Sequence, residues 1–280
     1  MNRKRMMIIG AILLIVGGTA AYGIWQVERP GGLVWQDGFK YKRLGEISQS
    51  DFSSQLPADS TTIKNLMITV RNEDVTITKG TRFRVATTKF GSKGSDKALS
   101  VTFKDGSLSI EENRDHESPV FFGINNFTHK IHIEIPEDSH LASIEVKNKN
   151  GDLNVNHLKQ LDSLLVSSDN GDVTLENIMA KFVRVSSQNG DLAVKHVNLD
   201  SVSAKNQNGD ISFKSSKILN RGGISNENGD IDLEKTEIPD FYAVTIFGDK
   251  EIKRRQVGKE ISRETAKLRV LNRNGDIEID

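Results

Sequence analysis

Residues 183–213 read VRVSSQNGDLAVKHVNLDSVSAKNQNGDISF and hold two copies of one pattern, each centred on the triplet Asn-Gly-Asp. In the first copy, Val183 and Val185 stand six and four positions before the Asn, and Leu192 and Val194 follow the triplet. Apolar residues at every second position predict short strands that bury one face. Asn-Gly is a strong turn signal because both residues tolerate positive φ. The pattern therefore predicts strand, turn, strand.

The pattern recurs along the second half of the chain. Asn-Gly-Asp occurs six times, and its asparagines are spaced by 20, 19, 19, 20 and 46 residues. Degraded copies precede these, at Asn72-Glu73-Asp74 and Asp105-Gly106-Ser107. The predicted turn residues of the six full copies are Asn150, Gly151, Asp152, Asn170, Gly171, Asp172, Asn189, Gly190, Asp191, Asn208, Gly209, Asp210, Asn228, Gly229, Asp230, Asn274, Gly275 and Asp276.

Two all-β architectures fit these repeats. A right-handed β-solenoid (a single-stranded β-helix) would have about eight coils of about 20 residues, with equivalent residues stacked about 4.8 Å apart. Stacked β-hairpins in an antiparallel sheet are the alternative. The solenoid explains why like residues recur at like positions, and proline is absent between Pro136 and Pro239, as parallel ladders require. We expect the solenoid to span residues 61–280, with excursions near 78–98, 112–140 and 240–265.

The amino terminus predicts a membrane anchor. Residues 6–25 read MMIIGAILLIVGGTAAYGIW without a charge, and a helix of that length rises about 30 Å, the thickness of a hydrocarbon core. The basic stub of residues 1–5 places the amino terminus in the cytoplasm. A cleaved signal peptide is the competing interpretation. In either case residues after 25 lie outside the cytoplasm, beginning with a juxtamembrane stalk over 26–60. The predicted location is a single-pass protein of the cell membrane.

Composition excludes several classes of protein. Lysine and arginine number 38, as do aspartate and glutamate, so the zero net charge argues against a nucleic-acid binder. The absence of cysteine excludes disulfides, thiol nucleophiles and cysteine-ligated metals. We find no catalytic, phosphate-binding or metalloprotease motif, so we expect neither an enzyme nor a cofactor or metal.

The repeat frame, behind a basic and apolar amino terminus, resembles the bacterial putative-adhesin β-strand-repeat family, whose membrane-anchored members include LiaG-like proteins of Gram-positive envelope-stress operons. The segment Ile131–Pro136, followed by Leu141–Ile144, resembles the opening of that family's repeats. The resemblance covers about residues 60–280. It implies an extracytoplasmic β-solenoid without an established catalytic motif, and it carries no functional residue to this chain.

The repeated aspartates admit two interpretations. They would form a row along the solenoid, and carboxylate rows in other solenoids bind calcium. Calcium needs several oxygens per ion, however, and one triplet in twenty residues supplies them sparsely. We therefore expect the aspartates to accept turn amides and the asparagines to bond to one another through their side-chain amides.

Two excursions supply the candidate contact residues. The first holds Phe121, Phe122 and Phe127 in a predicted loop rich in Gly and Asn, which either forms an apolar contact patch or caps the solenoid. The second is basic and holds Lys253, Arg254 and Arg255, which either meet anionic wall polymers or are solvated.

These observations predict a non-catalytic binding or scaffolding module, adhesin-like, at the cell envelope. Its expected partners are the membrane and either a cell-wall polymer or a membrane protein. The alternative is an accessory regulator of an envelope-stress system that acts through a membrane partner.

Overall fold

A computed structural model describes residues 31–35, 39–43, 47–90, 99–112, 120–122, 129–253 and 258–280. The chain forms two compact units, of which the smaller comprises residues 1–48, 90–95 and 115–127 and the larger comprises the rest. The predicted membrane segment 6–25, and Phe127, Arg254 and Arg255, lie outside the described residues. Within the described ranges, no helix has the length and apolar character needed to cross a bilayer.

The described part of the smaller unit is a three-stranded antiparallel sheet. Its central strand β1 (Gly31–Trp35) pairs with β2 (Phe39–Arg43) on one side and β9 (Val120–Phe122) on the other. Phe121 and Phe122 therefore lie in a strand, where we had expected a loop.

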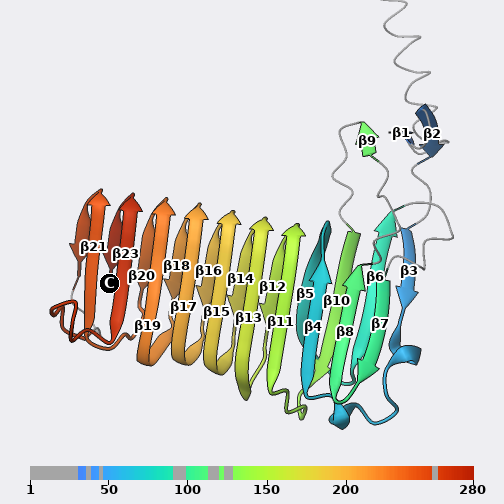
Figure 1. The fold of residues 1–280 in the computed structure, drawn as a ribbon, viewed down its shortest axis with the longest axis horizontal. Helices are drawn as coiled ribbons and strands as arrows, with labels where there is room; N and C mark the ends of the chain where they lie inside the picture. Colours follow the sequence, from blue (N-terminus) through green and yellow to red (C-terminus); the bar gives the residue numbers. More distant parts are fainter. Residues whose placement is uncertain are drawn as a thin grey trace, which may run out of the picture. The chain divides into compact units, whose positions relative to one another are not determined.

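The larger unit consists of two long sheets that face each other (Figure 1). The ten-stranded sheet has the order β21 (Phe241–Phe247), β23 (Leu268–Asn274), β19 (Lys217–Asn228), β17 (Asn198–Asn208), β15 (Met179–Asn189), β13 (Leu161–Asn170), β11 (Ser143–Asn150), β4 (Asn65–Val70), β8 (Ser107–Glu112) and β7 (Leu99–Lys104). The eleven-stranded sheet has the order β22 (Lys250–Ile252), β24 (Ile277–Ile279), β20 (Ile231–Glu234), β18 (Ile211–Lys214), β16 (Leu192–Lys195), β14 (Val173–Glu176), β12 (Leu153–Asn156), β5 (Glu73–Gly80), β10 (His129–Pro136), β6 (Arg84–Phe90) and β3 (Ile47–Asp51).

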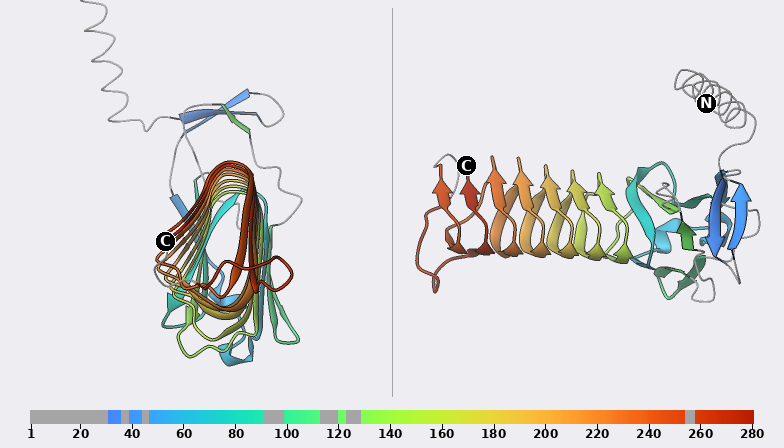
Figure 2. Two further views of the ribbon diagram at one scale, coloured as in Figure 1. Left: turned by 90° about the vertical axis from the view of Figure 1, so that its left-hand side faces the viewer. Right: turned by 90° about the horizontal axis from the view of Figure 1, so that it is seen from above.

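Each Asn-Gly-Asp triplet joins the two sheets. The strand before it belongs to the ten-stranded sheet and the strand after it to the eleven-stranded sheet, and we call such a pair of strands a coil (Figure 2). Neighbouring coils pair in parallel and in register, so that Asn150 faces Asn170 and Asn170 faces Asn189. The two strands flanking a triplet do not pair with each other, and the stacked-hairpin alternative is therefore wrong. The chain has an all-β, solenoid-like fold; its right-handed sense and the count of about eight coils stay predictions.

The inward-facing residues of the frame form the core between the sheets. In β13 and β14, the side chains of Leu164, Val166, Val173 and Leu175 are at most 2% exposed. Each fully buried side chain of this kind contributes about 1.5–3 kcal/mol relative to an exposed one. Because a coil has too few such residues to fold alone, neighbouring coils must stack to bury a continuous core.

The copy predicted at Asp105-Gly106-Ser107 is a different structure. β7 and β8 pair antiparallel within one sheet, so these residues form a hairpin turn. Asp105 and Gly106 both have positive φ, 50° and 77°, as a two-residue hairpin turn requires. In the Asn-Gly-Asp triplets only the glycine has positive φ. The chain therefore turns back on itself as a hairpin where two consecutive residues have positive φ, and it passes to the other sheet where only the glycine does.

The predicted excursion at 240–265 was wrong in its first half. Residues 241–252 form the coil β21/β22, with Phe247-Gly248-Asp249 in place of Asn-Gly-Asp. Phe247 pairs with Asn274, and Gly248 has φ 159°, at the upper limit of the left-handed range. The sequence did not predict this turn because Phe247 stands where the repeats have Asn.

The folded part also begins earlier than residue 61. β3 lies at the edge of the eleven-stranded sheet, and the Phe52 side chain is buried in the core. The remaining predicted excursions contain β6 and β10, which pair antiparallel with each other. The segment predicted as a stalk, residues 26–60, contains strands β1, β2 and β3.

Replacing Gly190 with Ala should destabilise the protein. A Cβ there would lie closer than 3.0 Å to the carbonyl oxygen of Gly171, on a backbone with φ 130°. We expect a loss of at least about 2 kcal/mol in the free energy of unfolding, measured by chemical denaturation. The matched control is Gly223→Ala in β19, where a Cβ would meet nothing within 4 Å and stability should stay equal or rise. Equal stability of the two variants would contradict the stacked turns.

Candidate functional site

The triplet aspartates connect neighbouring coils. The Oδ1 atom of each accepts the backbone N–H of the aspartate in the next coil in space, as Asp172 does from Asp191. The N···O distances along this row are 2.7–3.0 Å, from Asp74 to Asp249. Each carboxylate thus satisfies a turn amide that no strand partner reaches.

The triplet asparagines form a second row. Each donates Nδ2–H to Oδ1 of the preceding asparagine at 2.7–2.9 Å, from Asn150 on Asn72 to Asn274 on Asn228. An amide both donates and accepts, so it can continue such a row indefinitely. Phe247 cannot, and the row ends there. The eighteen turn residues therefore have bonding partners within the fold.

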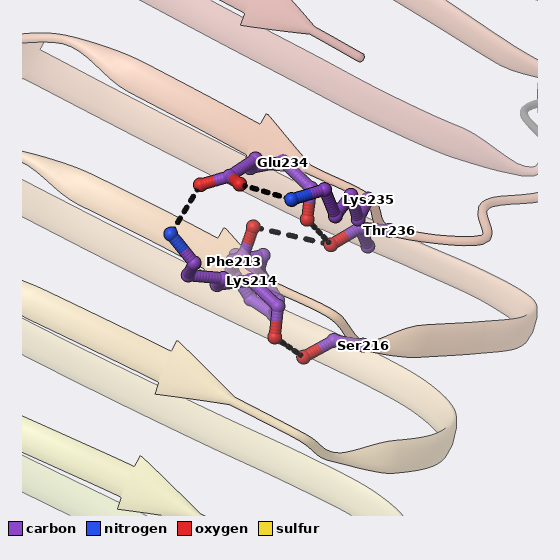
Figure 3. Close-up of polar contacts among 6 residues, drawn as sticks. All are labelled: Phe213, Lys214, Ser216, Glu234, Lys235 and Thr236. Atoms are coloured by element: carbon purple, nitrogen blue, oxygen red, sulfur yellow. Dashed lines mark hydrogen bonds and ion pairs between the residues drawn. The ribbon is translucent and has the colours of Figure 1, made fainter. Parts of the chain in front are cut away.

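The corner at the other end of the coils is also closed by polar side chains (Figure 3). The Thr236 hydroxyl donates to the carbonyl oxygens of Phe213 and Glu234 at 3.1 and 3.0 Å, and Ser216 bonds to Lys214 O at 2.9 Å. The Lys214 ammonium lies 2.5 Å from Glu234, which holds the pKa of Glu234 below its usual value. The charge of Lys214 is thus neutralised by the Glu234 carboxylate of the neighbouring coil.

A groove of about 880 Å³ lies on the outer face of the ten-stranded sheet, over β15, β17, β19 and β23. Outward positions in register form a row across these strands: Arg184, Ser203, Gly223 and Arg269. Of this row, Gly223 and Arg269 line the groove, and the small residues Ser201 and Gly222 line it beside them. Arg184 lies beside the groove, over the ring of its lining residue Phe182, with 5.5 Å between the guanidinium and the ring centroid.

A β-bulge shapes the groove. Leu199 pairs with Ile218 but Ser201 pairs with Arg221, so β19 carries one more residue than β17 at this point. Gly222 then takes an inward position that is apolar in the other full copies. A Cβ on Gly222 would lie 2.6 Å from Val202 Cγ1, so the close approach of the two strands requires glycine.

Three of the four cations that line the groove are free of ion pairs. Among the described residues, Arg221, Lys267 and Arg269 are exposed and have no carboxylate partner within ion-pair distance. Lys181 differs, since Asp162 lies 2.7 Å away and raises its pKa. The one carboxylate in the lining, Asp200, accepts a hydrogen bond from the Asn220 amide. The groove therefore presents three cations outside ion-pair distance of a carboxylate. The pKa of Glu264 is lowered by hydrogen bonds from its own backbone N–H and from Ser262, and also by the charges of Arg263 and Arg269.

The groove extends towards a corner of the coils. A second hollow of about 560 Å³ shares Lys181 and Asp200 with it and is lined by Met179 and Leu219, each 46% exposed. The combined surface is basic with apolar side chains at one end.

The structure does not bring the predicted contact residues into this groove. Lys253 follows β22 in the opposite sheet, where its ammonium bonds to Glu278 and lies 3.5 Å from Glu251, so its charge is compensated. Phe121 and Phe122 belong to the smaller unit. Part of the sequence signal was available, since Arg184 and Arg269 each stand five residues before the Asn of their copy and Gly222 breaks the frame. The sequence did not show that a bulge beside Gly222 brings Arg221, seven residues before Asn228, close to Arg269.

Carboxylates gather on the opposite sheet. A hollow of about 450 Å³ there is lined by Asp191, Asp210, Asp230, Asp232, Asp276 and Glu278, among other residues. Burial, together with the nearby carboxylates of Glu278 and Glu234, raises the pKa of Asp232. Within the part of the chain that the structure describes, no group of three or more His, Asp or Glu side chains is placed to hold a metal ion.

Comparisons with known proteins agree with this architecture. The model of the Toastrack DUF4097 family matches residues 63–280. The chain belongs to the Toastrack DUF4097 family. No curated protein matches it significantly.

Several solved structures resemble this Toastrack chain. A protein from Parabacteroides distasonis described as a putative lipid binding protein is 11% identical, with a TM-score of 0.51, over 84% of this chain and 98% of that one. Two described as putative adhesins, from Bacteroides fragilis and P. distasonis, are 15% and 13% identical, with TM-scores of 0.43 and 0.45, and each comparison covers 84% of this chain and 97% or 98% of the other. At these identities the likeness concerns the fold alone.

Calcium should leave the thermal stability of this Toastrack protein unchanged. The Oδ1 atoms of the aspartate row already accept amides, which leaves too few oxygens in one place for the six to eight that calcium needs. We expect 2 mM calcium chloride to shift the melting temperature by less than about 1 °C relative to magnesium chloride at the same concentration. A calcium-specific rise of several degrees would show a site that the hydrogen-bonded row does not account for.

Proposed function

We propose that this protein is a non-catalytic, adhesin-like binding module of the cell envelope, anchored by residues 6–25, whose groove on the ten-stranded sheet binds a negatively charged envelope polymer. The single observation that carries the proposal is the cluster of unpaired Arg221, Lys267 and Arg269 around a floor of small residues. The basic and apolar amino-terminal segment supports the extracytoplasmic setting.

The charge of the groove favours an anionic ligand. Elsewhere on the coils, exposed lysines such as Lys214 and Lys253 lie beside carboxylates. Arginines and a lysine left unpaired on one face can bond to phosphate or carboxylate groups, and the planar guanidinium suits both. An anionic group of the ligand takes the place beside these cations that a protein carboxylate takes beside Lys214 and Lys253.

The geometry of the groove favours an extended ligand. Arg184 and Arg269 stand three strands apart in the same row, which is about 14 Å at the usual strand spacing. The small lining residues between these strands, Ser201, Gly222 and Gly223, leave room for a chain to lie across the strands. A polymer with repeated negative charges can reach both arginines at once.

The lining supports binding more than catalysis. General acid–base hydrolysis of a polysaccharide uses a pair of carboxyl groups on either side of the scissile bond. Asp200 is the one carboxylate among the lining residues, and the Asn220 amide bonds to it. The groove thus offers positive charge without an acid–base pair.

Neutralising the groove should weaken binding to anionic polymers. We expect the full-length double variant Arg221→Gln/Arg269→Gln to bind isolated cell walls, or a soluble polyphosphate-containing wall polymer, at least about tenfold more weakly than the parent in cosedimentation at low salt. Arg71→Gln is the matched control, since Arg71 is also exposed but lies outside the groove. The parent should lose retention as salt rises. Equal losses in both variants, or retention that salt does not alter, would contradict the proposal.

A further inference from the structure

The last two coils lie in reverse order. Coil β23/β24, the end of the chain, pairs with β19/β20 on one side and with β21/β22 on the other (Figure 1). Residues 241–252 precede it in sequence but lie beyond it in space. The carboxyl-terminal segment is therefore inserted into a slot between β19/β20 and β21/β22.

The chain begins the coil after β20 in the ordinary order and then leaves it. Glu237 forms a parallel bridge with Lys217, and its carbonyl accepts the N–H of Ile218 at 2.8 Å. Three residues later, the Asp240 carbonyl accepts the N–H groups of Lys267 and Leu268, at 2.9 and 3.2 Å. The slot opens at this point. Phe247 also follows Asn228 by 19 residues, the regular repeat spacing, so residues 241–252 have the frame to stack directly on β19/β20.

Both coils that flank the slot bond to the carboxyl-terminal segment at its Asn-Gly-Asp triplet. On one wall, Asn274 donates to Asn228 Oδ1 at 2.7 Å and the Asp276 N–H donates to Asp230 at 2.8 Å. On the other, the Asp249 N–H donates to Asp276 at 2.7 Å and the Thr245 hydroxyl donates to Gly275 O at 2.8 Å. Leu268, Val270, Ile277 and Ile279 are fully buried between the walls. Every one of these contacts joins the segment to residues distant in sequence.

We propose that this slot is an interaction site for a second copy of the chain, whose residues 268–280 occupy it in exchange for the resident segment. Residues 253–267 connect the segment to its own coil, and fifteen residues can reach up to about 50 Å when extended. The contacts that hold a segment from another copy are the same as those that hold the resident one, so the two arrangements differ in free energy only through the connection and the concentration. Coils at the end of a repeat array open most readily, and opening of the end coil β21/β22 uncovers the slot and admits the exchange.

Single-cysteine variants test the exchange in a chain that has no cysteine of its own. Asn228 and Asn274 are neighbours on adjacent strands, at a spacing that a disulfide can span. Full-length Asn228→Cys, labelled with ¹⁵N, and unlabelled Asn274→Cys are mixed, warmed below the melting temperature and oxidised. We expect a disulfide between residues 228 and 274 of different chains, with a dimer-to-monomer ratio that rises about tenfold for a tenfold rise in concentration.

Two controls keep the test decisive. The double variant Asn228→Cys/Asn274→Cys should form the disulfide within one chain, which shows that the coils are folded and in the inserted order. A mixture of Asn208→Cys and Asn228→Cys, which join coils consecutive in sequence, should give no disulfide between chains. Absence of a disulfide between residues 228 and 274 of different chains in the 228–274 mixture, at every concentration tested, would overturn the proposal. A disulfide within the double variant Asn228→Cys/Phe247→Cys would overturn it as well, because the coils would then lie in sequence order without a slot.

Discussion

The close stacking of one glycine on the next is the constraint on which the structure depends. At each triplet after the first, the glycine backbone passes so near the carbonyl of the preceding triplet's glycine that a side chain would overlap it, as at Gly171 over Gly151. This contact sets the coils in register. In register, the asparagine amides and aspartate carboxylates of neighbouring coils reach each other, and the apolar positions meet across the core. Turn, ladder and core are thus three consequences of one repeated backbone conformation.

The same constraint leaves the outward positions free. Inward residues are mostly apolar, with a buried Asn or Ser two positions before each triplet, and triplet residues must continue the rows. Arg184, Ser203, Gly223 and Arg269 affect neither the core nor the rows. The chain can therefore vary the charge of a face without disturbing the fold. Here unpaired cations gather over β15, β17, β19 and β23 of the ten-stranded sheet, and carboxylates gather on the eleven-stranded sheet, although the net charge of the chain is zero. A binding function placed on such a face needs no strained or buried polar group.

Most of the fold could be predicted from the sequence because the frame repeats, and each copy supports the others. The predictions were wrong at a turn that resembles the triplet without joining the sheets, and at a coil whose turn lacks the triplet asparagine. Asp105-Gly106 has the composition of the triplet but reverses the chain, since a second residue takes positive φ. Phe247-Gly248-Asp249 keeps the backbone of the triplet but lacks the asparagine. The groove was missed because it depends on the bulge beside Gly222 and on side chains from four coils, neither of which a single repeat contains.

Hydrogen exchange at the triplets tests the central claim most directly. The N–H of Asp191 donates to Asp172 at 2.9 Å and that of Asp210 donates to Asp191 at 2.9 Å, although both residues are exposed turn residues. If the rows hold the coils in register, these amides exchange orders of magnitude more slowly than free peptide, and as slowly as the amides of β15 and β17. Exchange of these amides at the free-peptide rate, with the strands still protected, would contradict the account.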